Sequence, residues 1–245
     1  MRYKITIEYS GKNYGGWQRQ KNANSIQEEL ENALSTLFEQ KIVVFGSGRT
    51  DAGVHAYGQV AHFDANNVKI PTEKLVYPLN ILLPSDIKVK DCSVADDSFH
   101  AQFDAKRKTY IYKTYLARIS SPIKDGFYAQ TIPPINTEKI REAAQLLVGE
   151  HNFKSFSASG GTPKKSFTRI IYRIDIKEDG EDIIFEVEGN GFLYNMVRII
   201  VGTLIAVGKD KIPKENILLM LGGAPRKLGG KTYPPDGLYL KEVIY

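Results

Sequence analysis

The chain has 245 residues, of which 42% are hydrophobic and 25% charged, so it can form one large or two modest domains with a buried core. Its single cysteine, Cys92, excludes an internal disulfide and a cysteine-rich metal site, and the absence of an apolar leader or membrane-length run predicts a cytoplasmic protein. The net charge of +5 is uneven: residues 105–245 hold 22 Lys and Arg against 15 Asp and Glu, which favours a polyanionic partner for that half.

The first hundred residues alternate between strand and helix patterns. Residues 2–9 alternate apolar and polar side chains, which predicts a half-buried strand. Ser25 and Glu28 form a capping box, and the helix that follows is predicted to bury Ile26, Leu30, Ala33, Leu34 and Leu37. Further strands are predicted at residues 42–45, 59–63 and 87–94, with a short helix at 71–81. This β-α-β-β-α-β order is typical of a ferredoxin-like fold.

The loop between the first strand and the first helix contains the only tryptophan of the chain. We expect Trp17 to pack against the sheet and Arg19 to lie near a polyanionic partner such as RNA.

A glycine-rich loop follows the strand predicted at residues 42–45. Arg49, Thr50 and Asp51 are its only adjacent charged or hydroxyl side chains, and so bare a loop lets a ligand approach closely. An aspartate in such a loop commonly caps its own backbone while a neighbouring arginine is solvated. The alternative is an active-site carboxylate.

The second half repeats the pattern of the first. Strands are predicted at residues 105–117, 167–176, 183–187 and 237–244, helices at 136–148 and 191–207, and loops at 120–134, 155–168 and 224–235. We therefore predict two ferredoxin-like α/β domains, residues 1–104 and 105–245. Their mixed, mainly antiparallel sheets are expected to join, with the active site in the cleft between them.

Two features of the second half carry chemical content. Tyr110 and Tyr112 share one face of a strand that opens with the basic triplet at residues 106–108, although such a pair is usually core packing. Arg198 is the only charge in the apolar run 189–208, so its guanidinium needs an anionic partner. Glu188 and Asp175 are the candidates for a purely structural ion pair.

Several of these segments resemble the TruA family of pseudouridine synthases, which isomerise uridine in transfer RNA. They are GRTDAGVHA at 48–56, GQVAHF at 58–63, FHAQF at 99–103 followed by YIY at 110–112, MVRIIVG at 196–202 and GLYL at 237–240. The resemblance implies that Asp51 is catalytic, with Arg49 beside it. It also implies that Tyr110, and not Tyr112, contacts the target base, that Arg198 pairs with Asp51, and that Leu238 lines the pocket for the base.

The resemblance further implies the substrate and its partners. The expected activity is on uridines 38 to 40 of the anticodon arm, by a homodimer, with no metal and no nucleotide cofactor. The uridine must leave its stack, and Arg49 is placed to occupy the vacated space or hold a phosphate. Lys164-Lys165 and Arg226-Lys227 are candidates for phosphate contacts in the basic half.

Two other functions remain open from the residues alone. One is a non-catalytic RNA-binding module, which would have no need for a carboxylate at Asp51. The other is a metal hydrolase using Asp51, His55 and His62, but no HxH, HExxH or cysteine spacing supports it. We therefore expect both histidines to be structural.

Overall fold

The computed structural model describes residues 1–66, 68–160 and 166–245, which form two compact units. The first unit comprises residues 1–106 and 239–245, and the second comprises residues 107–238. Residues 239–245, which hold all but the first residue of the last strand, thus belong to the first unit, although the repeated pattern placed them in the second. Lys164 and Lys165, the first pair of expected phosphate contacts, lie outside the described residues.

The first unit is built on a sheet whose central strand is β1 (Arg2–Tyr9). It pairs antiparallel with β3 (His55–Asp64) on one side and with β4 (Ile87–Ala95) on the other. The short β2 (Phe45–Gly46) pairs with the end of β3, and β10 (Leu238–Ile244) runs parallel to its beginning. The order β4-β1-β3-β2 is ferredoxin-like, which confirms the predicted α/β class with mainly antiparallel strands.

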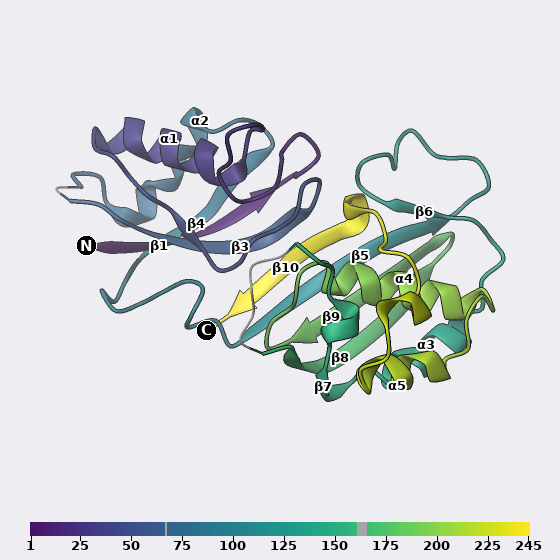
Figure 1. Ribbon diagram of the computed structural model, residues 1–245. Helices are drawn as coiled ribbons and strands as arrows, with labels where there is room; N and C mark the ends of the chain where they lie inside the picture. Colours follow the sequence, from purple (N-terminus) through teal and green to yellow (C-terminus); the bar gives the residue numbers. More distant parts are fainter. Residues whose placement is uncertain (67, 161–165) are drawn as a thin grey trace. The chain divides into compact units, whose positions relative to one another are not determined.

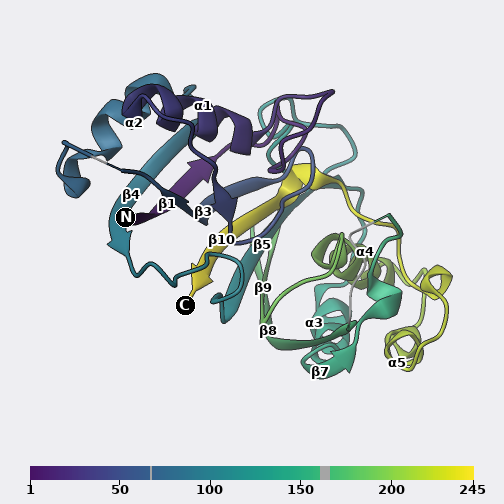
Figure 2. The same cartoon turned by 60° about the vertical axis from the view of Figure 1, so that its left-hand side comes forward.

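Two helices, α1 (Ile26–Phe38) and α2 (Val76–Leu82), lie on one face of this sheet (Figures 1 and 2). The Ser25 hydroxyl accepts a hydrogen bond from the N–H of Glu28 at 3.3 Å, so the predicted N-cap is confirmed. The predicted apolar face of α1 is buried except at Leu37, which is half-buried. Glu31 is also buried in α1, which the apolar pattern did not predict.

The strand predicted at residues 42–45 is wrong over most of its length, because only Phe45 joins β2. The N–H of Val44 donates to the Glu31 carboxylate at 3.1 Å, and the Val44 carbonyl accepts from the Gln27 amide at 3.1 Å. Side chains of α1 therefore satisfy the backbone groups that a neighbouring strand would otherwise have bonded.

The second unit contains a sheet in the order β5-β9-β8-β7, in which neighbouring strands are antiparallel, with β6 parallel to β5. Its strands are β5 (Arg107–Leu116), β6 (Ala129–Thr131), β7 (Gly149–Asn152), β8 (Thr168–Asp179) and β9 (Asp182–Gly189). The predicted strands β5, β8 and β9 are confirmed. The short β6 and β7 were not predicted, because three or four residues are too few to show a period.

Helices α3 (Thr137–Gln145), α4 (Met196–Gly208) and α5 (Glu215–Leu221) lie on one face of this second sheet (Figure 2). The α5 helix was not predicted. The α4 helix begins later than the predicted residue 191, because Asn195 adopts a left-handed conformation with φ of 59° that a helix cannot contain.

The α4 helix is apolar on nearly every side because it is buried in the core. None of the helices in the described ranges is long and apolar enough to cross a membrane. One backbone segment passes against α4 at Gly202, where an added Cβ would lie 1.8 Å from the carbonyl oxygen of Lys231. A Cβ on Gly230 would in turn lie 2.0 Å from the carbonyl oxygen of Gly202. Glycine is therefore required at this crossing.

Replacing Gly202 by alanine should lower the free energy of unfolding by about 1–3 kcal/mol, the usual cost of overpacking a core. Urea denaturation followed by circular dichroism measures this loss. The matched control is Gly222→Ala at the end of α5, where an added Cβ would come no closer than 3.4 Å to its neighbours. Equal effects of the two substitutions would contradict the close approach.

Candidate active site

The loop that carries Asp51 joins β2 to β3 in the first unit, as predicted. It turns where the N–H of Val54 donates to the Asp51 carbonyl at 3.1 Å and Gly53 adopts φ of 79°. Arg49 is exposed, Thr50 is buried and Asp51 is half-buried. The loop therefore presents the arginine to solvent, leaves Asp51 partly exposed, and is anchored at the residue between them.

Thr50 is anchored through both its backbone and its side chain. Its carbonyl accepts the N–H of Trp17 at 3.0 Å, and its hydroxyl lies 2.8 Å from the buried hydroxyl of Tyr9. Burial raises the pKa of Tyr9, so this phenol stays neutral. Trp17 is 3% exposed, which confirms that it packs in the core.

Gly16 allows this anchoring because it lies directly against the loop. It has φ of 105°, and an added Cβ would lie 2.6 Å from the Thr50 carbonyl oxygen. Any side chain here would displace the backbone next to Asp51.

The segment that enters the loop is held by a buried glutamine of β3. The Ser47 hydroxyl donates to Gln59 Oε1 at 2.7 Å, and Gln59 Nε2 donates to the Gly48 carbonyl at 2.9 Å. Neither Ser47 nor Gln59 is exposed to solvent. These bonds fix the backbone that precedes Asp51, whereas the turn at Gly53 follows it.

His55 and His62 are both buried and both accept a backbone hydrogen bond. His55 Nδ1 accepts the N–H of Gly11 and His62 Nδ1 accepts the N–H of Ala101, each at 3.1 Å. Burial, with the positive charge of Arg2, lowers the pKa of His62 to about 4. The described residues contain no group of three or more His, Cys, Asp or Glu side chains that could hold a metal ion.

The two tyrosines of β5 differ in exposure although they share a face. Tyr112 is fully buried and donates its hydroxyl to the Pro234 carbonyl at 2.7 Å. Tyr110 is half-buried, and its ring meets the edge of Phe192 at a centroid distance of 5.1 Å. Tyr110 is thus the one with a partly accessible ring, whereas Tyr112 is a core residue.

Arg198 is half-buried on α4 and is held by neighbours in its own unit. Its Nε donates to the Tyr233 carbonyl and its Nη1 to Asn195 Oδ1, both at 2.7 Å. These bonds orient the plane of the guanidinium.

The two acids considered as structural partners of Arg198 are bound by other arginines. Glu188 accepts hydrogen bonds from Arg107 and Arg173, and Asp175 pairs with Arg173. Both acids thus have arginine partners other than Arg198.

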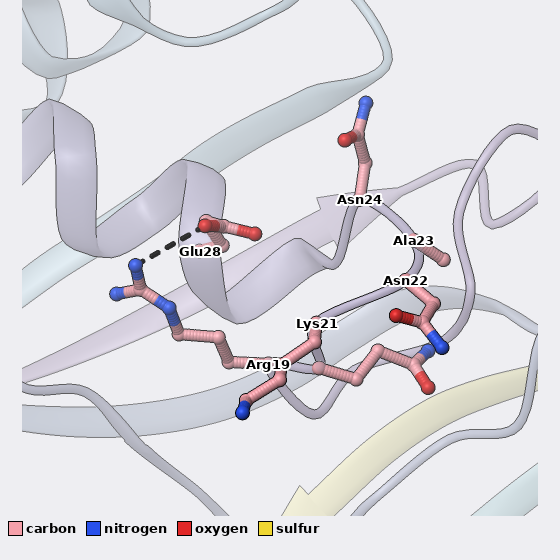
Figure 3. A pocket seen from close by; sticks show the side chains of 7 residues that line it. Arg19, Lys21, Asn22, Ala23, Asn24 and Glu28 are labelled. Carbon is pink, nitrogen blue, oxygen red and sulfur yellow. Dashed lines mark ion pairs between the residues drawn. The ribbon is translucent and has the colours of Figure 1, made fainter.

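The remaining candidates are Arg19 and Leu238. Arg19 lies in the first unit beside an open cavity of about 670 Å³ lined by residues 19–24 and Glu28 (Figure 3). Its guanidinium is 3.2 Å from Glu28 and 3.3 Å from Glu31, so two acids offset its charge. Leu238 is 6% exposed at the start of β10.

The structure thus places Asp51, Arg49 and Arg19 in the first unit and Tyr110, Arg198 and Leu238 in the second. Within the first unit it adds supporting residues that the sequence analysis missed, Tyr9, Gly16, Ser47 and Gln59, and it gives Thr50 an anchoring role. The one available signal was the Gly15-Gly16 pair before Trp17, since adjacent glycines often mark a close backbone approach.

Comparison with known proteins gives a family match across most of the chain. The family model described as tRNA pseudouridine synthase matches residues 5–104 and 143–245. A protein of Ruminiclostridium cellulolyticum named tRNA pseudouridine synthase A is 46% identical over 244 residues, covering 99% of this chain and 98% of its own. Proteins of the same name from Thermoanaerobacter sp. and Bacillus subtilis are 45% and 44% identical, covering 98% and 100% of this chain and 98% and 99% of their own.

The comparison with solved structures includes distant similarities. A chain of a crystallised Cbf5-Nop10-Gar1 complex aligns with 83% of this chain and 45% of its own length, at 12% identity and a TM-score of 0.38. A similarity this low supports no argument about fold or function.

The buried His62 makes stability depend on pH. Since its pKa is about 4 in the folded protein against the ordinary 6.5, the unfolded chain binds more protons between these values. The neutral, buried His62 should contribute its full stabilisation above pH 6.5. As the pH falls to about 4, the free energy of unfolding should decrease by at most about 3 kcal/mol. Urea titrations of the parent and of His62→Gln across this range test it. An unchanged pH dependence in the variant would contradict the assignment.

Proposed function

Because this chain belongs to the tRNA pseudouridine synthase family, we propose that it isomerises uridine to pseudouridine in the anticodon stem-loop of transfer RNA, at positions 38 to 40. The match extends over both units of the chain. The observation that carries the proposal is the Asp51 loop, which holds a half-buried aspartate on a backbone bonded on both sides.

The reaction requires few chemical groups. It breaks the N1–C1′ bond, turns the uracil and joins C5 to C1′, with no redox change and no phosphate transfer. A single carboxylate serves this chemistry as a nucleophile at C1′ or C6, or as a base on a glycal route. We assign this role to Asp51.

Two residues of the second unit are proposed to assist. Tyr110 faces the base and helps to remove the proton from C5, which fits its half-buried ring. Arg198 is proposed as the basic residue that, in this class of enzymes, pairs with the catalytic aspartate and favours its ionised form. Leu238 is proposed to line the pocket for the uracil.

Binding of the RNA is proposed to rest on basic side chains. Arg49 is exposed beside Asp51, where it occupies the space left by the extruded uridine or holds its phosphate. Arg226 and Lys227, with Arg19 in the first unit, are further phosphate contacts. We also propose a homodimer in the cytoplasm, where transfer RNA is modified.

Asp51→Asn should lower the rate of tritium release from transfer RNA labelled at C5 of uridine by about 1,000-fold or more, because it removes the reacting carboxylate. The affinity for transfer RNA should change little. Asp64→Asn, which loses only an exposed pair with Arg2, is the control and should retain activity. The parent reaction is run with and without chelator, and inhibition by the chelator would favour the metal-dependent alternative. Turnover by Asp51→Asn at the parent rate would favour the non-catalytic alternative for this loop.

Arg198→Met should lower the rate of isomerisation far more than the affinity for transfer RNA. Arg198→Lys should recover little, because an ammonium lacks the planar fork that bonds Tyr233 and Asn195. The lost bonds should lower the free energy of unfolding by roughly 1–2 kcal/mol. Arg173→Met, which removes an arginine bonded only by acids on the described strands β8 and β9, is the matched control and should keep the parent rate. Parent activity in Arg198→Met would end its proposed role.

A further inference from the structure

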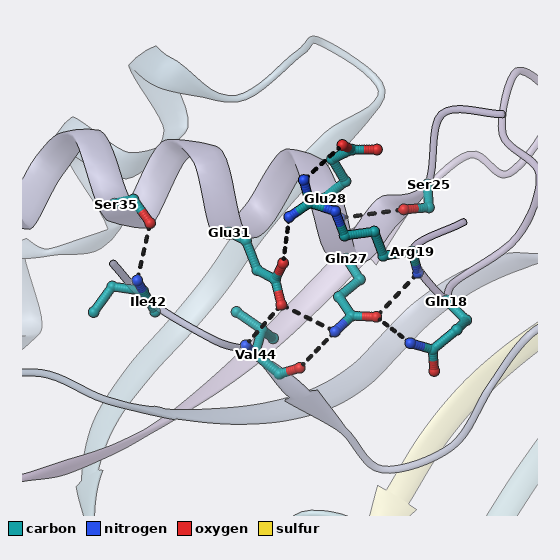
Figure 4. A network of polar contacts seen from close by, with 9 residues as sticks. All are labelled: Gln18, Arg19, Ser25, Gln27, Glu28, Glu31, Ser35, Ile42 and Val44. Carbon is teal, nitrogen blue, oxygen red and sulfur yellow. Dashed lines mark hydrogen bonds and ion pairs between the residues drawn. The ribbon is translucent and has the colours of Figure 1, made fainter. Parts of the chain in front are cut away.

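We infer that Gln27 and Glu31, on the first turns of α1, are positioning residues for the Asp51 loop, which they hold through the backbone of Val44 (Figure 4). The inference rests on the proposed function, in which Asp51 is catalytic. Neither side chain needs to contact the RNA for this role.

The two side chains together replace a strand partner for Val44. Glu31 Oε1 accepts the N–H of Val44 at 3.1 Å, and Gln27 Nε2 donates to the Val44 carbonyl at 3.1 Å. Gln27 Nε2 also donates to Glu31 Oε1 at 3.0 Å, so the pair is itself connected. The Val44 backbone is therefore bonded on both sides immediately before β2, from which the chain enters the loop.

The same glutamine also holds the second segment that contacts the loop. Gln27 Oε1 accepts the N–H of Arg19 at 3.1 Å, and the backbone N–H of Gln27 donates to the Trp17 carbonyl at 3.0 Å. Trp17 in turn donates to the Thr50 carbonyl, and its indole lies against Gly46, where an added Cβ would be 2.6 Å from the ring. The start of α1 thus fixes both the entry to the loop and the segment that anchors Thr50.

The chemistry of Glu31 supports a positioning role over a merely stabilising one. Its side chain is 9% exposed, and an apolar side chain of similar size would fill this position without the cost of burying a carboxylate. Only a side chain with an acceptor at this place can bond the N–H of Val44. Glu31 also pairs with Arg19, so the two interactions must be separated experimentally.

Comparison of Glu31→Ala with Glu31→Gln separates the bond to Val44 from the pair with Arg19. The alanine variant loses both interactions, whereas the amide oxygen of glutamine can still accept from Val44 and Gln27, and only the hydrogen bond and ion pair with Arg19 are lost. We expect Glu31→Ala to lower the single-turnover rate of tritium release by about 10- to 100-fold, the scale of small misplacements at a reacting group. Its affinity for transfer RNA should stay within about threefold of the parent, and Glu31→Gln should restore most of the rate.

The fluorescence of Trp17, the only tryptophan, gives a readout that is independent of catalysis. Acrylamide quenching of this buried indole should increase in Glu31→Ala and stay near the parent level in Glu31→Gln. Because quenching is measured without turnover, it tests whether Gln27 and Glu31 hold this segment even if Asp51 proves not to be catalytic.

Ser35→Ala is the matched control. Ser35 is also on α1 and accepts the N–H of Ile42 at 3.0 Å, so its loss removes a similar bond to the same segment but farther from the loop (Figure 4). It should change neither the rate nor the quenching. Should Glu31→Ala fail to fold, Gln27→Ala at a half-buried position removes the donor to Val44 and should show the same two effects. Equal rate losses in Glu31→Ala and Glu31→Gln, or unchanged quenching in the alanine variant, would overturn the inference.

Discussion

The loop that carries Asp51 is rich in glycine, and its position depends on the contacts that keep it in one conformation. Such a loop has high conformational entropy when free, and ordering each residue costs about 1–2 kcal/mol. Here Thr50 provides the fixed point, because its carbonyl and hydroxyl are bonded by Trp17 and Tyr9 inside the core. Buried polar groups are costly to leave unpaired, so these bonds strongly disfavour other positions of the loop. Asp51 follows directly and takes its position from this anchor.

Three separate segments of the chain hold the loop. Tyr9 ends β1, Trp17 lies before α1, and Gln59 lies on β3. Tyr9 and Trp17 both bond Thr50, whereas Gln59 bonds Ser47 and Gly48, so the loop is fixed at its backbone and at the hydroxyls of Ser47 and Thr50. Because these anchors come from outside the loop, the loop itself needs few large side chains, which suits the extruded uridine that we propose it binds.

In the second unit, α4 has a similar organising role. Arg198 donates to the Tyr233 carbonyl, while Tyr112 of β5 donates to the next carbonyl, that of Pro234. The glycine contact between Gly202 and Gly230 lets this segment pass directly over the helix. A helix, a strand and a connecting segment therefore set the orientation of the arginine that we propose to act in catalysis. Its orientation depends on packing throughout the unit.

The sequence alone was sufficient for the strands with clear alternation and the capped helix α1, and it supplied the candidate catalytic residues, whose roles stay predictions. These are local properties: a period of two, a capping box, and a motif at fixed spacing. The burial of Glu31 and the loss of the strand at residues 42–44 followed only from tertiary structure, because a helix side chain took the place of a strand partner. Likewise, the sequence placed Tyr110 and Tyr112 on one face, but only the tertiary structure buries Tyr112, whose hydroxyl donates to the Pro234 carbonyl. Contacts between residues far apart in the chain leave no periodic signal, and these contacts hold the loop of Asp51.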